Sequence, residues 1–185
     1  MRVEPLSFYE LMRTSHISRW HVVNTSKGQN LAEHQYNVAV IGMELYRAYT
    51  GEEITARFIA ALLFHDSAEI RYGDVPTPGK AFMRQFTNQP DLFEKMDTAI
   101  MPSIPFFKDE VSWGLGPIIK LADLIEAAWW ISENGVGAHA RFVADKCRQQ
   151  MREFIHDNNY HEIANPVLID LGMMPVSRSE RTTPP

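Results

Sequence analysis

Four side chains of the metal-binding type stand apart in this sequence: His34, the adjacent pair His65-Asp66, and Asp123. Asp123 interrupts an apolar run over residues 119–125, where an ionised carboxylate is costly to bury unless a cation or a hydrogen-bond network compensates it. Each of the four alone is more often a structural hydrogen-bonding residue. Together, two imidazoles and two carboxylates form a mixed nitrogen and oxygen shell that leaves positions open for water and phosphate oxygens. The sequence therefore predicts a divalent metal site for manganese, cobalt, iron or zinc, with magnesium also open.

A metal ion held by these residues would serve hydrolysis. A bound divalent cation lowers the pKa of water from about 15.7 toward about 7 and polarises a phosphoryl oxygen. Glu69 lies four residues after His65, so on a helix its carboxylate can reach the same cavity and orient or deprotonate the attacking water. The alternative is that Glu69 is a solvated carboxylate at a helix end. The sequence thus predicts phosphate ester hydrolysis, with Asp66 and Glu69 among the catalytic groups.

The elements that must position these side chains are helices, because helical periodicity recurs along the chain while strand patterns are scarce. We expect an all-α fold in one compact domain over residues 1–176, with a mobile tail over 177–185. The predicted helices span residues 5–14, 30–51, 54–70, 91–101, 117–131 and 138–157.

Three of these helices carry the candidate ligands. The helix that bears His34 begins at Asn30, which has the spacing of a reciprocal N-terminal cap with the glutamate three residues later. The next helix is expected to continue unbroken through His65 and Asp66, and to end at the glycine and prolines that follow. The helix with Asp123 in its middle is apolar around most of its circumference, so it is predicted to be buried.

Composition narrows the class of protein. A chain of 185 residues and 21.2 kDa fits one domain, and its 45% hydrophobic and 22% charged residues are typical of a globular protein. No apolar run reaches the length of a membrane span, so we expect no membrane partner. The first residues lack the pattern of a secretory signal, and the single cysteine, Cys147, allows no internal disulfide, which favours a cytoplasmic location. A net charge of -5 and a pI near 5.8 argue against a nucleic-acid polymer as partner.

The ordered set of histidines and aspartates resembles the signature of the HD-domain phosphohydrolases, an all-helical superfamily of metal-dependent enzymes. The HD dipeptide alone has little specificity, but two further motifs narrow the resemblance to the bacterial 5'-deoxynucleotidases and the compact bacteriophage dATP triphosphohydrolases. The motifs that carry the resemblance are Arg19-Trp20, Phe64-His65-Asp66-Ser67-Ala68-Glu69 and Gly73-Asp74-Val75-Pro76-Thr77-Pro78-Gly79-Lys80. It extends over roughly residues 15–128.

The resemblance implies roles for the matching positions. It implies that Arg19 and Lys80 bind phosphate, that Glu69 serves the nucleophilic water, and that Asp74 contacts the 3'-hydroxyl of a deoxyribose. These roles are chemically sound, because a guanidinium fork and an ammonium suit phosphate and a carboxylate accepts from a sugar hydroxyl. Arg19 is thereby counted with Asp66 and Glu69 as catalytic.

Trp20 and Val22 are the candidate base-recognition residues. They are alternate residues whose side chains can point together, with Arg19 directed at phosphate from the neighbouring position. The resemblance implies a steric filter that favours adenine by leaving no room for the amino group of guanine. An ordinary core tryptophan and valine are the alternative from the sequence alone.

The substrate stays open between the two subfamilies. The short separation of Asp66 and Asp123 favours a dATP triphosphohydrolase, which releases deoxyadenosine and triphosphate, over a 5'-deoxynucleotidase, which releases orthophosphate from dNMPs. Arg71, Arg84 and Lys120 are further basic residues that can meet a triphosphate tail.

A non-catalytic nucleotide-binding module is a third hypothesis, disfavoured because all ligands and the candidate base are present. The acidic net charge disfavours a nuclease or a cyclic-dinucleotide phosphodiesterase. The resemblance also implies a homo-oligomer.

Overall fold

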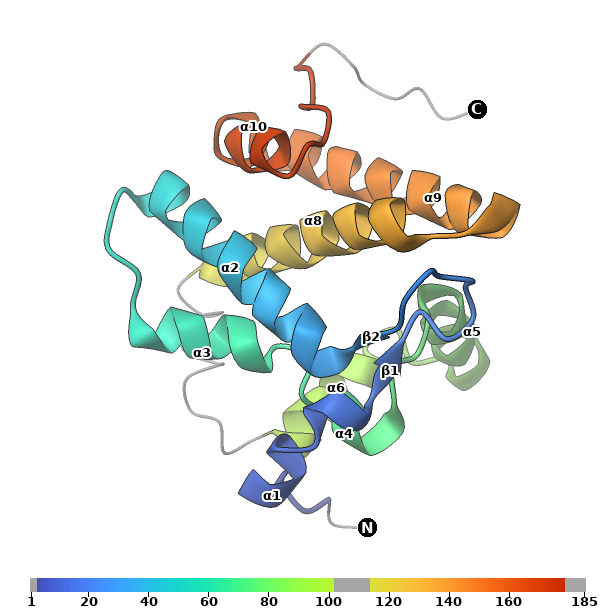
Figure 1. Ribbon diagram of the computed structural model, residues 1–185. Coiled ribbons are helices and arrows are strands. Elements are labelled where there is room, and N and C mark those ends of the chain that lie inside the picture. Colours follow the sequence, from blue (N-terminus) through green and yellow to red (C-terminus); the bar gives the residue numbers. More distant parts are fainter. Residues whose placement is uncertain (1–2, 102–113, 179–185) are drawn as a thin grey trace.

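The computed structural model describes residues 3–101 and 114–178, which are predominantly helical (Figure 1). The all-α prediction is confirmed; a short antiparallel pair, β1 (Ser18–Arg19) with β2 (Gln29–Asn30), is the one sheet in the described part of the chain. No helix in that part is long and apolar enough to cross a membrane. The helices are α1 (Phe8–Leu11), the 3-10 helix η1 (Thr14–His16), α2 (Leu31–Thr50), α3 (Ala56–Phe64), α4 (Glu69–Tyr72), α5 (Thr77–Thr87), α6 (Leu92–Ile100), α8 (Gly116–Asn134), α9 (Gly137–Asp157) and α10 (His161–Asp170).

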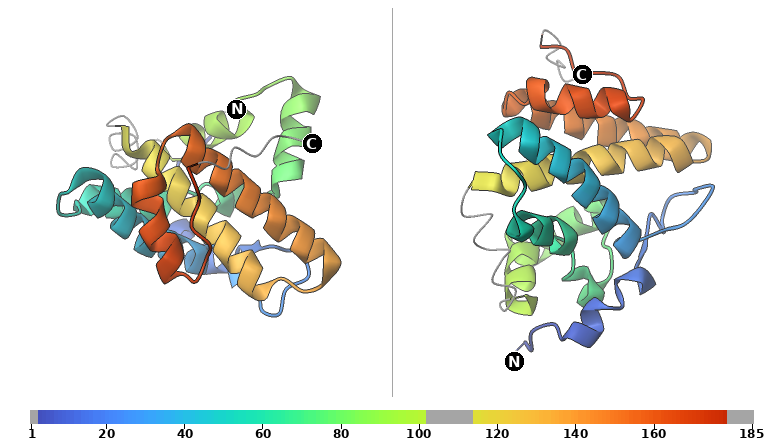
Figure 2. Two further views of the ribbon diagram at one scale, coloured as in Figure 1. Left: turned by 90° about the horizontal axis from the view of Figure 1, so that it is seen from above. Right: turned by 60° about the vertical axis from the view of Figure 1, so that its left-hand side comes forward.

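Helices α2, α8 and α9 form the centre of the fold. α8 packs against both α2 and α9, and α10 packs against α2 and α9 (Figure 1; Figure 2). Their shared core is apolar: Leu45 of α2, Ile125 of α8 and Ile155 of α9 are fully buried. Burying such a side chain stabilises the fold by about 1.5–3 kcal/mol. This core therefore fixes α2 and α8, two of the helices that carry candidate ligands.

Helix α2 begins where the sequence predicts. The Asn30 side chain accepts from the backbone N–H of Glu33 at 2.9 Å, and Gly51, with a φ of 72°, ends the helix. The predicted reciprocal half of the cap is absent, because the Glu33 carboxylate instead accepts from Lys27 Nζ at 3.2 Å. The remaining cap still satisfies the first turn of α2 and so fixes the position of His34.

The chain breaks its helix at the histidine-aspartate pair. The prediction of one continuous helix over 54–70 is wrong, because α3 ends just before His65 and α4 begins at Glu69. His65 Nδ1 donates to the carbonyl of Leu62 at 2.8 Å and competes for an acceptor that a continuing helix would use. The backbone proceeds through tight turns instead, and the N–H of Glu69 donates to the carbonyl of Asp66 at 3.0 Å.

The sequence-based prediction also misses two helices. Pro78 lies in the first turn of α5, where proline is tolerated, although the prediction treats it as a stop signal. Helix α10 continues through Pro166, which hides its periodicity. The predicted helix over 5–14 is shorter, as α1 followed by η1, while the helices predicted over 91–101, 117–131 and 138–157 are present as α6, α8 and α9.

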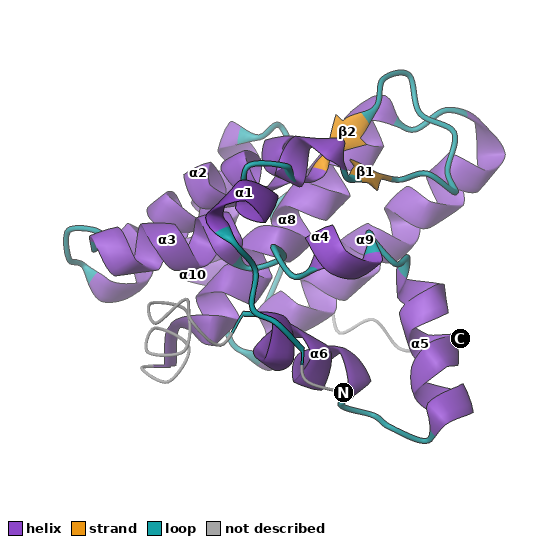
Figure 3. Ribbon diagram, turned by 90° about the horizontal axis from the view of Figure 1, so that it is seen from below, coloured by secondary structure: helices purple, strands orange, loops and turns teal. Residues whose placement is uncertain are grey.

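Helix α5 projects from the rest of the helices (Figure 3). None of its residues is buried, and Phe86 near its end is 80% exposed. Two ion pairs hold it to its neighbours: Lys80 with Glu69 of α4, and Arg84 with Glu94 of α6. The helix therefore depends on polar contacts more than on the apolar core.

The C-terminal end of the described chain lies against α10. Val176 exchanges two backbone hydrogen bonds with the Asn165 side chain, and Arg178 pairs with Glu162 at 2.6 Å. Most of the predicted tail, residues 179–185, lies outside the described residues. The domain boundary at residue 176 therefore stays a prediction.

Candidate metal centre and active site

The four predicted ligands come together where α2, the end of α3 and α8 meet. One ligand atom from each of His34, His65, Asp66 and Asp123 lies within 4.8 Å of all the others. His34 Nε2 is 3.5 Å from an oxygen of Asp66 and 3.5 Å from an oxygen of Asp123, and His65 Nε2 is 3.3 Å from Asp66 Oδ2. Atoms that share a zinc ion at about 2.1 Å lie roughly 3–3.5 Å from each other. The spacing therefore fits one shared cation.

Two buried imidazole nitrogens in this cluster have no hydrogen-bond partner: Nε2 of His34 and Nε2 of His65. The other nitrogen of each ring is engaged, because His65 Nδ1 donates to Leu62 and His34 Nδ1 donates to Glu126 Oε2 at 2.7 Å. A neutral ring that donates through Nδ1 presents a lone pair at Nε2. Both lone pairs face the two aspartates, an arrangement that needs a cation or protons between them. The residues present therefore fit a divalent metal ion.

The ionisation of the cluster agrees with this conclusion. Burial raises the pKa of Asp66, but the two neighbouring histidines hold it well below its ordinary value. Burial also raises the pKa of Asp123, and Lys120 lowers it to about 2. Burial and Arg19 lower the pKa of His34, but the adjacent carboxylates of Asp66 and Glu126 outweigh both and raise it to about 9 in the absence of a cation. Metal binding therefore competes with protons for the histidine nitrogens.

Glu69 lies beside the cluster and is only 1% exposed, so the alternative of a solvated carboxylate is wrong. Lys80 Nζ donates to its Oε1 at 3.0 Å, while Oε2 has no hydrogen-bond partner. Burial and the nearby Asp66 raise the pKa of Glu69 to about 8, against the lowering effect of Lys80. A buried carboxyl with one free oxygen and a pKa near neutrality is suited to proton transfer.

The short hairpin places Arg19 at the cluster. Arg19 pairs in register with Gln29, two residues before α2 begins. Its side chain is 10% exposed, with Nη1 3.5 Å from Asp66 Oδ2 and Nε without a partner. Burial lowers the pKa of Arg19, but Asp66 and Asp74 outweigh burial and raise it. Arg19, the candidate phosphate-binding residue, and Asp74, the candidate sugar-binding residue, therefore interact electrostatically.

Trp20 and Val22 lie on the loop between the two strands. The Trp20 ring stacks on Trp130, with centroids 5.8 Å apart and planes 3° from parallel, and its indole N–H donates to Gln29 Oε1 at 2.8 Å. Val22 is 59% exposed. Neighbouring side chains thus fix the Trp20 ring, and Val22 is open to contact with a ligand. Their roles in base recognition stay predictions.

Of the three further basic residues, Lys120 contacts the cluster, since its Nζ donates to Asp123 Oδ2 at 2.6 Å. Arg71 instead donates to the Glu10 carboxylate through Nε at 2.5 Å and Nη2 at 3.0 Å. Arg84 donates to an α6 carboxylate at 2.9 Å. Of these three residues, Lys120 therefore remains the candidate for binding a triphosphate tail.

Sequence reasoning missed Glu126, which is fully buried and accepts three hydrogen bonds. Its Oε1 accepts from Gln29 Nε2 at 2.6 Å and from Asn37 Nδ2 at 3.1 Å, and its Oε2 accepts from His34 Nδ1. A signal was available, because Glu126 follows Asp123 by three residues and so lies on the same face of an apolar helix.

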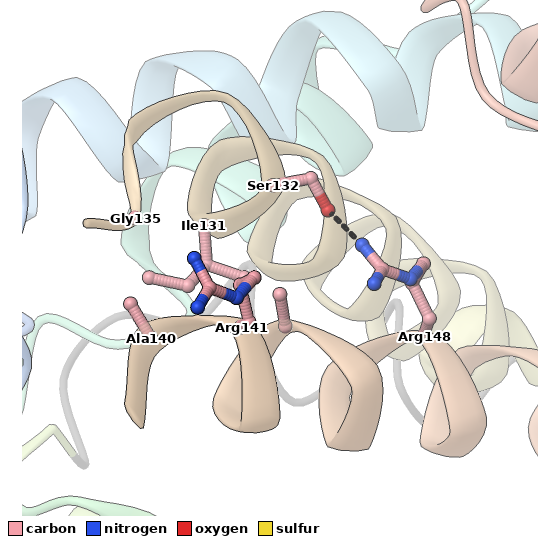
Figure 4. Close-up of a pocket in the computed structure, with 7 residues that line it drawn as sticks. Ile131, Ser132, Gly135, Ala140, Arg141 and Arg148 are labelled. Atoms are coloured by element: carbon pink, nitrogen blue, oxygen red, sulfur yellow. Dashed lines mark hydrogen bonds between the residues drawn. The ribbon is translucent and has the colours of Figure 1, made fainter. Parts of the chain in front are cut away.

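A separate small pocket of about 180 Å³ lies between α8 and α9 (Figure 4). Inside it Arg148 donates to Ser132 Oγ at 2.6 Å. No predicted site residue lines this pocket, so it is separate from the candidate metal site. The lining residues are Ile131, Ser132, Gly135, Ala140, Arg141, Ala144 and Arg148.

Two histidines and two aspartates that meet at one centre, from α2, from the turn after α3 and from α8, are the signature of the HD class of metal-dependent phosphohydrolases. Residues 7–165 match the protein family described as 5'-deoxynucleotidase YfbR-like. The chain is 32% identical over 159 residues to a dATP triphosphohydrolase of cyanophage S-2L, across 85% of this chain and 88% of the relative. It is 29% identical over 133 residues to the 5'-deoxynucleotidase YfbR of Salmonella arizonae, across 70% of this chain and 63% of the relative.

A solved structure agrees with these similarities. The cyanophage S-2L HD phosphohydrolase DatZ, described as bound to dA and one catalytic Zn²⁺ ion, matches with a TM-score of 0.68 and 31% identity, across 81% of this chain and 84% of that one. The chain therefore belongs to the YfbR-like family of HD phosphohydrolases. The predicted resemblance and the predicted class of metal-dependent phosphohydrolase are confirmed.

Proposed function

We propose that this chain hydrolyses dATP to deoxyadenosine and triphosphate. The observation that carries the proposal is that three cationic side chains, Arg19, Lys80 and Lys120, each bond or pair with a member of the acidic site. A triphosphate needs more positive charge than a monophosphate, and this set supplies it in a protein with a net charge of -5. The similarity to a cyanophage dATP triphosphohydrolase across most of both chains supports the same substrate.

The reaction replaces the bond between the α-phosphorus and the nucleoside 5'-oxygen by a bond from that phosphorus to a water oxygen. A divalent ion, when bound by the two histidines and two aspartates, supplies Lewis-acid activation of the water and of a phosphoryl oxygen. In its ionised form, Glu69 takes the proton of the attacking water on its free Oε2 and returns it toward the departing 5'-oxygen. Arg19 and Lys80 bind phosphoryl oxygens, and Lys120 binds the distal phosphates.

Asp74, Trp20 and Val22 bind the nucleoside in this proposal. The Asp74 carboxylate accepts from the sugar 3'-hydroxyl. Trp20 and Val22 form a wall that excludes the amino group of guanine. A wall needs a rigid side chain, and the Trp20 ring has two fixed partners, a stacked tryptophan and a hydrogen-bonded glutamine. These contacts support the filter.

A 5'-deoxynucleotidase is the second candidate, because the description of the matched family and the relative from Salmonella arizonae both carry that activity. In that reaction dAMP is the substrate, orthophosphate is released, and Lys120 has no distal phosphate to bind. A non-catalytic nucleotide-binding module is disfavoured, because the four candidate ligands meet at one centre with Glu69 beside them.

Product analysis tests the proposal. The protein is loaded with Zn²⁺, Co²⁺ or Mn²⁺ and incubated separately with each dNTP and dNMP, and the products are resolved by ion-exchange chromatography. Triphosphate and deoxyadenosine from dATP are expected. Orthophosphate from dAMP with intact dATP would replace the proposal by the nucleotidase. Binding without turnover would favour the non-catalytic module.

We also propose a homo-oligomer, supported by large apolar side chains on the surface: Phe8, Tyr9, Phe82 and Phe86. Size-exclusion chromatography with light scattering is expected to give a mass above 21.2 kDa. A monomer at micromolar concentration would end this proposal. The cytoplasmic location and the absence of a nucleic-acid polymer as partner stay predictions from composition.

A further inference from the structure

We propose that Gln29 is a positioning residue that couples the nucleoside side of the site to the metal ligand His34. A chain of hydrogen bonds runs from the Trp20 indole to Gln29, from Gln29 to Glu126, and from Glu126 to the His34 ring. The proposal rests on the proposed function in one respect, that Trp20 faces the nucleoside. The hydrogen bonds themselves do not depend on it.

The direction of each bond is fixed by chemistry. An indole N–H only donates and a carboxylate only accepts. Gln29 must therefore turn its carbonyl oxygen to Trp20 and its amide NH₂ to Glu126, since the opposite orientation breaks both contacts. The Glu126 carboxylate in turn accepts from Nδ1 of His34, which leaves the lone pair of Nε2 for a metal ion. One glutamine thus joins a donor-only group to an acceptor-only group, and no apolar residue can replace it.

Burial makes these contacts consequential. Gln29 is 2% exposed, and Glu126 and His34 are fully buried, so water cannot substitute for a lost partner. The three donor-acceptor distances are 2.8, 2.6 and 2.7 Å, in chain order from the indole to the imidazole. Leaving a buried polar group unpaired costs about 1–3 kcal/mol, and more when the group is charged. Displacement of one member therefore changes the bonding of the next.

One face of α8 supports both ends of the chain of hydrogen bonds. Asp123, Glu126 and Trp130 follow at steps of three and four residues, so they lie along one stripe of the helix. They supply a metal ligand, the support of His34, and the ring on which Trp20 stacks. The metal site and the tryptophan wall are therefore carried by one rigid element.

The backbone of Trp20 indicates that its position is imposed. Its φ of 58° is in the left-handed region, which bulky residues rarely adopt. Such a conformation persists only where surrounding contacts hold it. The stack on Trp130 and the bond to Gln29 hold the side chain, and the N–H of Val23 donates to the Trp20 carbonyl at 2.8 Å. Of these contacts, the bond to Gln29 leads to the metal ligand.

Two matched substitutions distinguish coupling between Trp20 and His34 from a role of Gln29 that is limited to hydrogen bonding with Glu126. Gln29→Met keeps the length of the side chain and removes both of its hydrogen bonds. Asn37→Leu removes another donor to the same Glu126 oxygen but has no bond to Trp20. Zn²⁺ affinity, measured by competition with a chromophoric chelator, is expected to fall about two- to tenfold in both variants. Glu126→Gln is the reference for loss of the supporting carboxylate charge, with about a 10- to 100-fold fall.

The indole resonance of Trp20 provides the readout that a purely structural role would not move. In ¹⁵N-tryptophan-labelled, metal-free protein, Trp20→Phe assigns this resonance. Zn²⁺ addition is expected to shift it in the parent protein and in Asn37→Leu, and to leave it unshifted in Gln29→Met. The ratio of dATP to dGTP hydrolysis is expected to fall in Gln29→Met and to stay unchanged in Asn37→Leu.

Unchanged Zn²⁺ affinity in Gln29→Met, or a Zn²⁺-dependent shift equal to that of the parent, would overturn the coupling. If Gln29→Met fails to fold, Trp20→Phe decides, because it keeps a smaller aromatic ring and removes the indole donor: its Zn²⁺ affinity is expected to fall about two- to tenfold, and no change refutes the proposal. Failure of the proposed function looks different, since it would abolish dATP hydrolysis in the parent while leaving the Zn²⁺ affinities and indole shifts as described.

Discussion

Lys80 on α5 and Glu69 on α4 form a hydrogen-bonded ion pair, with 3.0 Å between Nζ and Oε1, in which the glutamate is almost completely buried. The pair satisfies only one carboxylate oxygen, and Oε2 has no partner. A fold selected for stability alone would place an apolar residue here, so the buried carboxyl is a cost that function explains.

Without metal, Glu69→Gln is expected to be more stable than the parent protein, and this difference in the free energy of unfolding should grow as the pH rises. The carboxyl has an ordinary pKa of 4.5, and burial raises the pKa in the folded state to about 8. The folded state therefore binds the extra proton between these values, so the stability from this group falls as the pH rises from about 4.5 to about 8. The neutral amide avoids this loss. Since one unit of pKa shift corresponds to about 1.4 kcal/mol, we expect a gain of up to about 4 kcal/mol at pH 8 and none at pH 4.

Thermal unfolding with a chelator present, from pH 4 to pH 8.5, measures the difference between Glu69→Gln and the parent. The same variant, loaded with metal, should lose about 10²–10⁴-fold in kcat if Glu69 handles the proton. A stability difference that does not grow with pH would contradict the buried, protonated glutamate.

Asp123→Asn is expected to remove most metal affinity while the protein stays folded. The change deletes the ligand charge at nearly constant volume, and the side chain is partly exposed, so packing is little affected. We expect Zn²⁺ affinity to fall by more than about 100-fold with an unchanged helical circular dichroism spectrum. Metal content equal to that of the parent would refute the assignment of Asp123 as a ligand.

Lys120→Gln tests the triphosphate over the monophosphate. Loss of one charged hydrogen bond should raise the KM for dATP about tenfold at saturating metal, with little effect on the binding of dAMP. Arg71→Gln is the matched control. Because the Arg71 guanidinium is bound to Glu10, this variant is expected to have an unchanged KM. Equal effects of Lys120→Gln on dATP and dAMP would show that Lys120 does not bind the distal phosphates.

Trp20→Ala is expected to relax base selectivity. Without the ring, the amino group of guanine finds room, so the rate ratio of dATP to dGTP should fall about tenfold or more. The ratio of kcat/KM values measures this, with thymidine triphosphate as a control for general loss of activity. A constant ratio would end the steric filter.

Removal of the metal is expected to lower the thermal stability. An ion present at about 100 times its Kd stabilises the folded state by about 2.7 kcal/mol, which corresponds to roughly 5–10 °C in Tm for a chain of this size. Differential scanning fluorimetry with and without a chelator measures the shift. Asp123→Asn serves as the control, since its Tm should not respond to the chelator.

The candidate ligands were predictable because their chemistry conflicts with their surroundings. A carboxylate in the apolar run around Asp123 is costly to bury unless it is compensated. The presence of His34 and the His65-Asp66 pair indicates a metal ion as that compensation, and this inference needs no knowledge of the fold. The cap at Asn30 was predictable for a similar reason, since it depends on residues within one turn.

The rest depends on contacts between distant segments. The helix break at His65 is set by a side chain that takes a backbone acceptor, which no periodicity reveals. Gln29 is an ordinary polar residue in sequence, and only the hairpin and α8 together place it between Trp20 and Glu126. Helix α5 was missed because Pro78 is equally typical of a stop and of a first turn.

Helix α5 delivers Lys80 to the site although it contributes no buried residue to the fold. Detaching it would expose little apolar surface, so its opening should require far less free energy than unfolding α2 or α8. Amide hydrogen exchange would then run faster along α5 than along the ligand-bearing helices. Faster exchange in α5 would mean that the segment that supplies Lys80 can move while α2 and α8 keep the metal ligands in place.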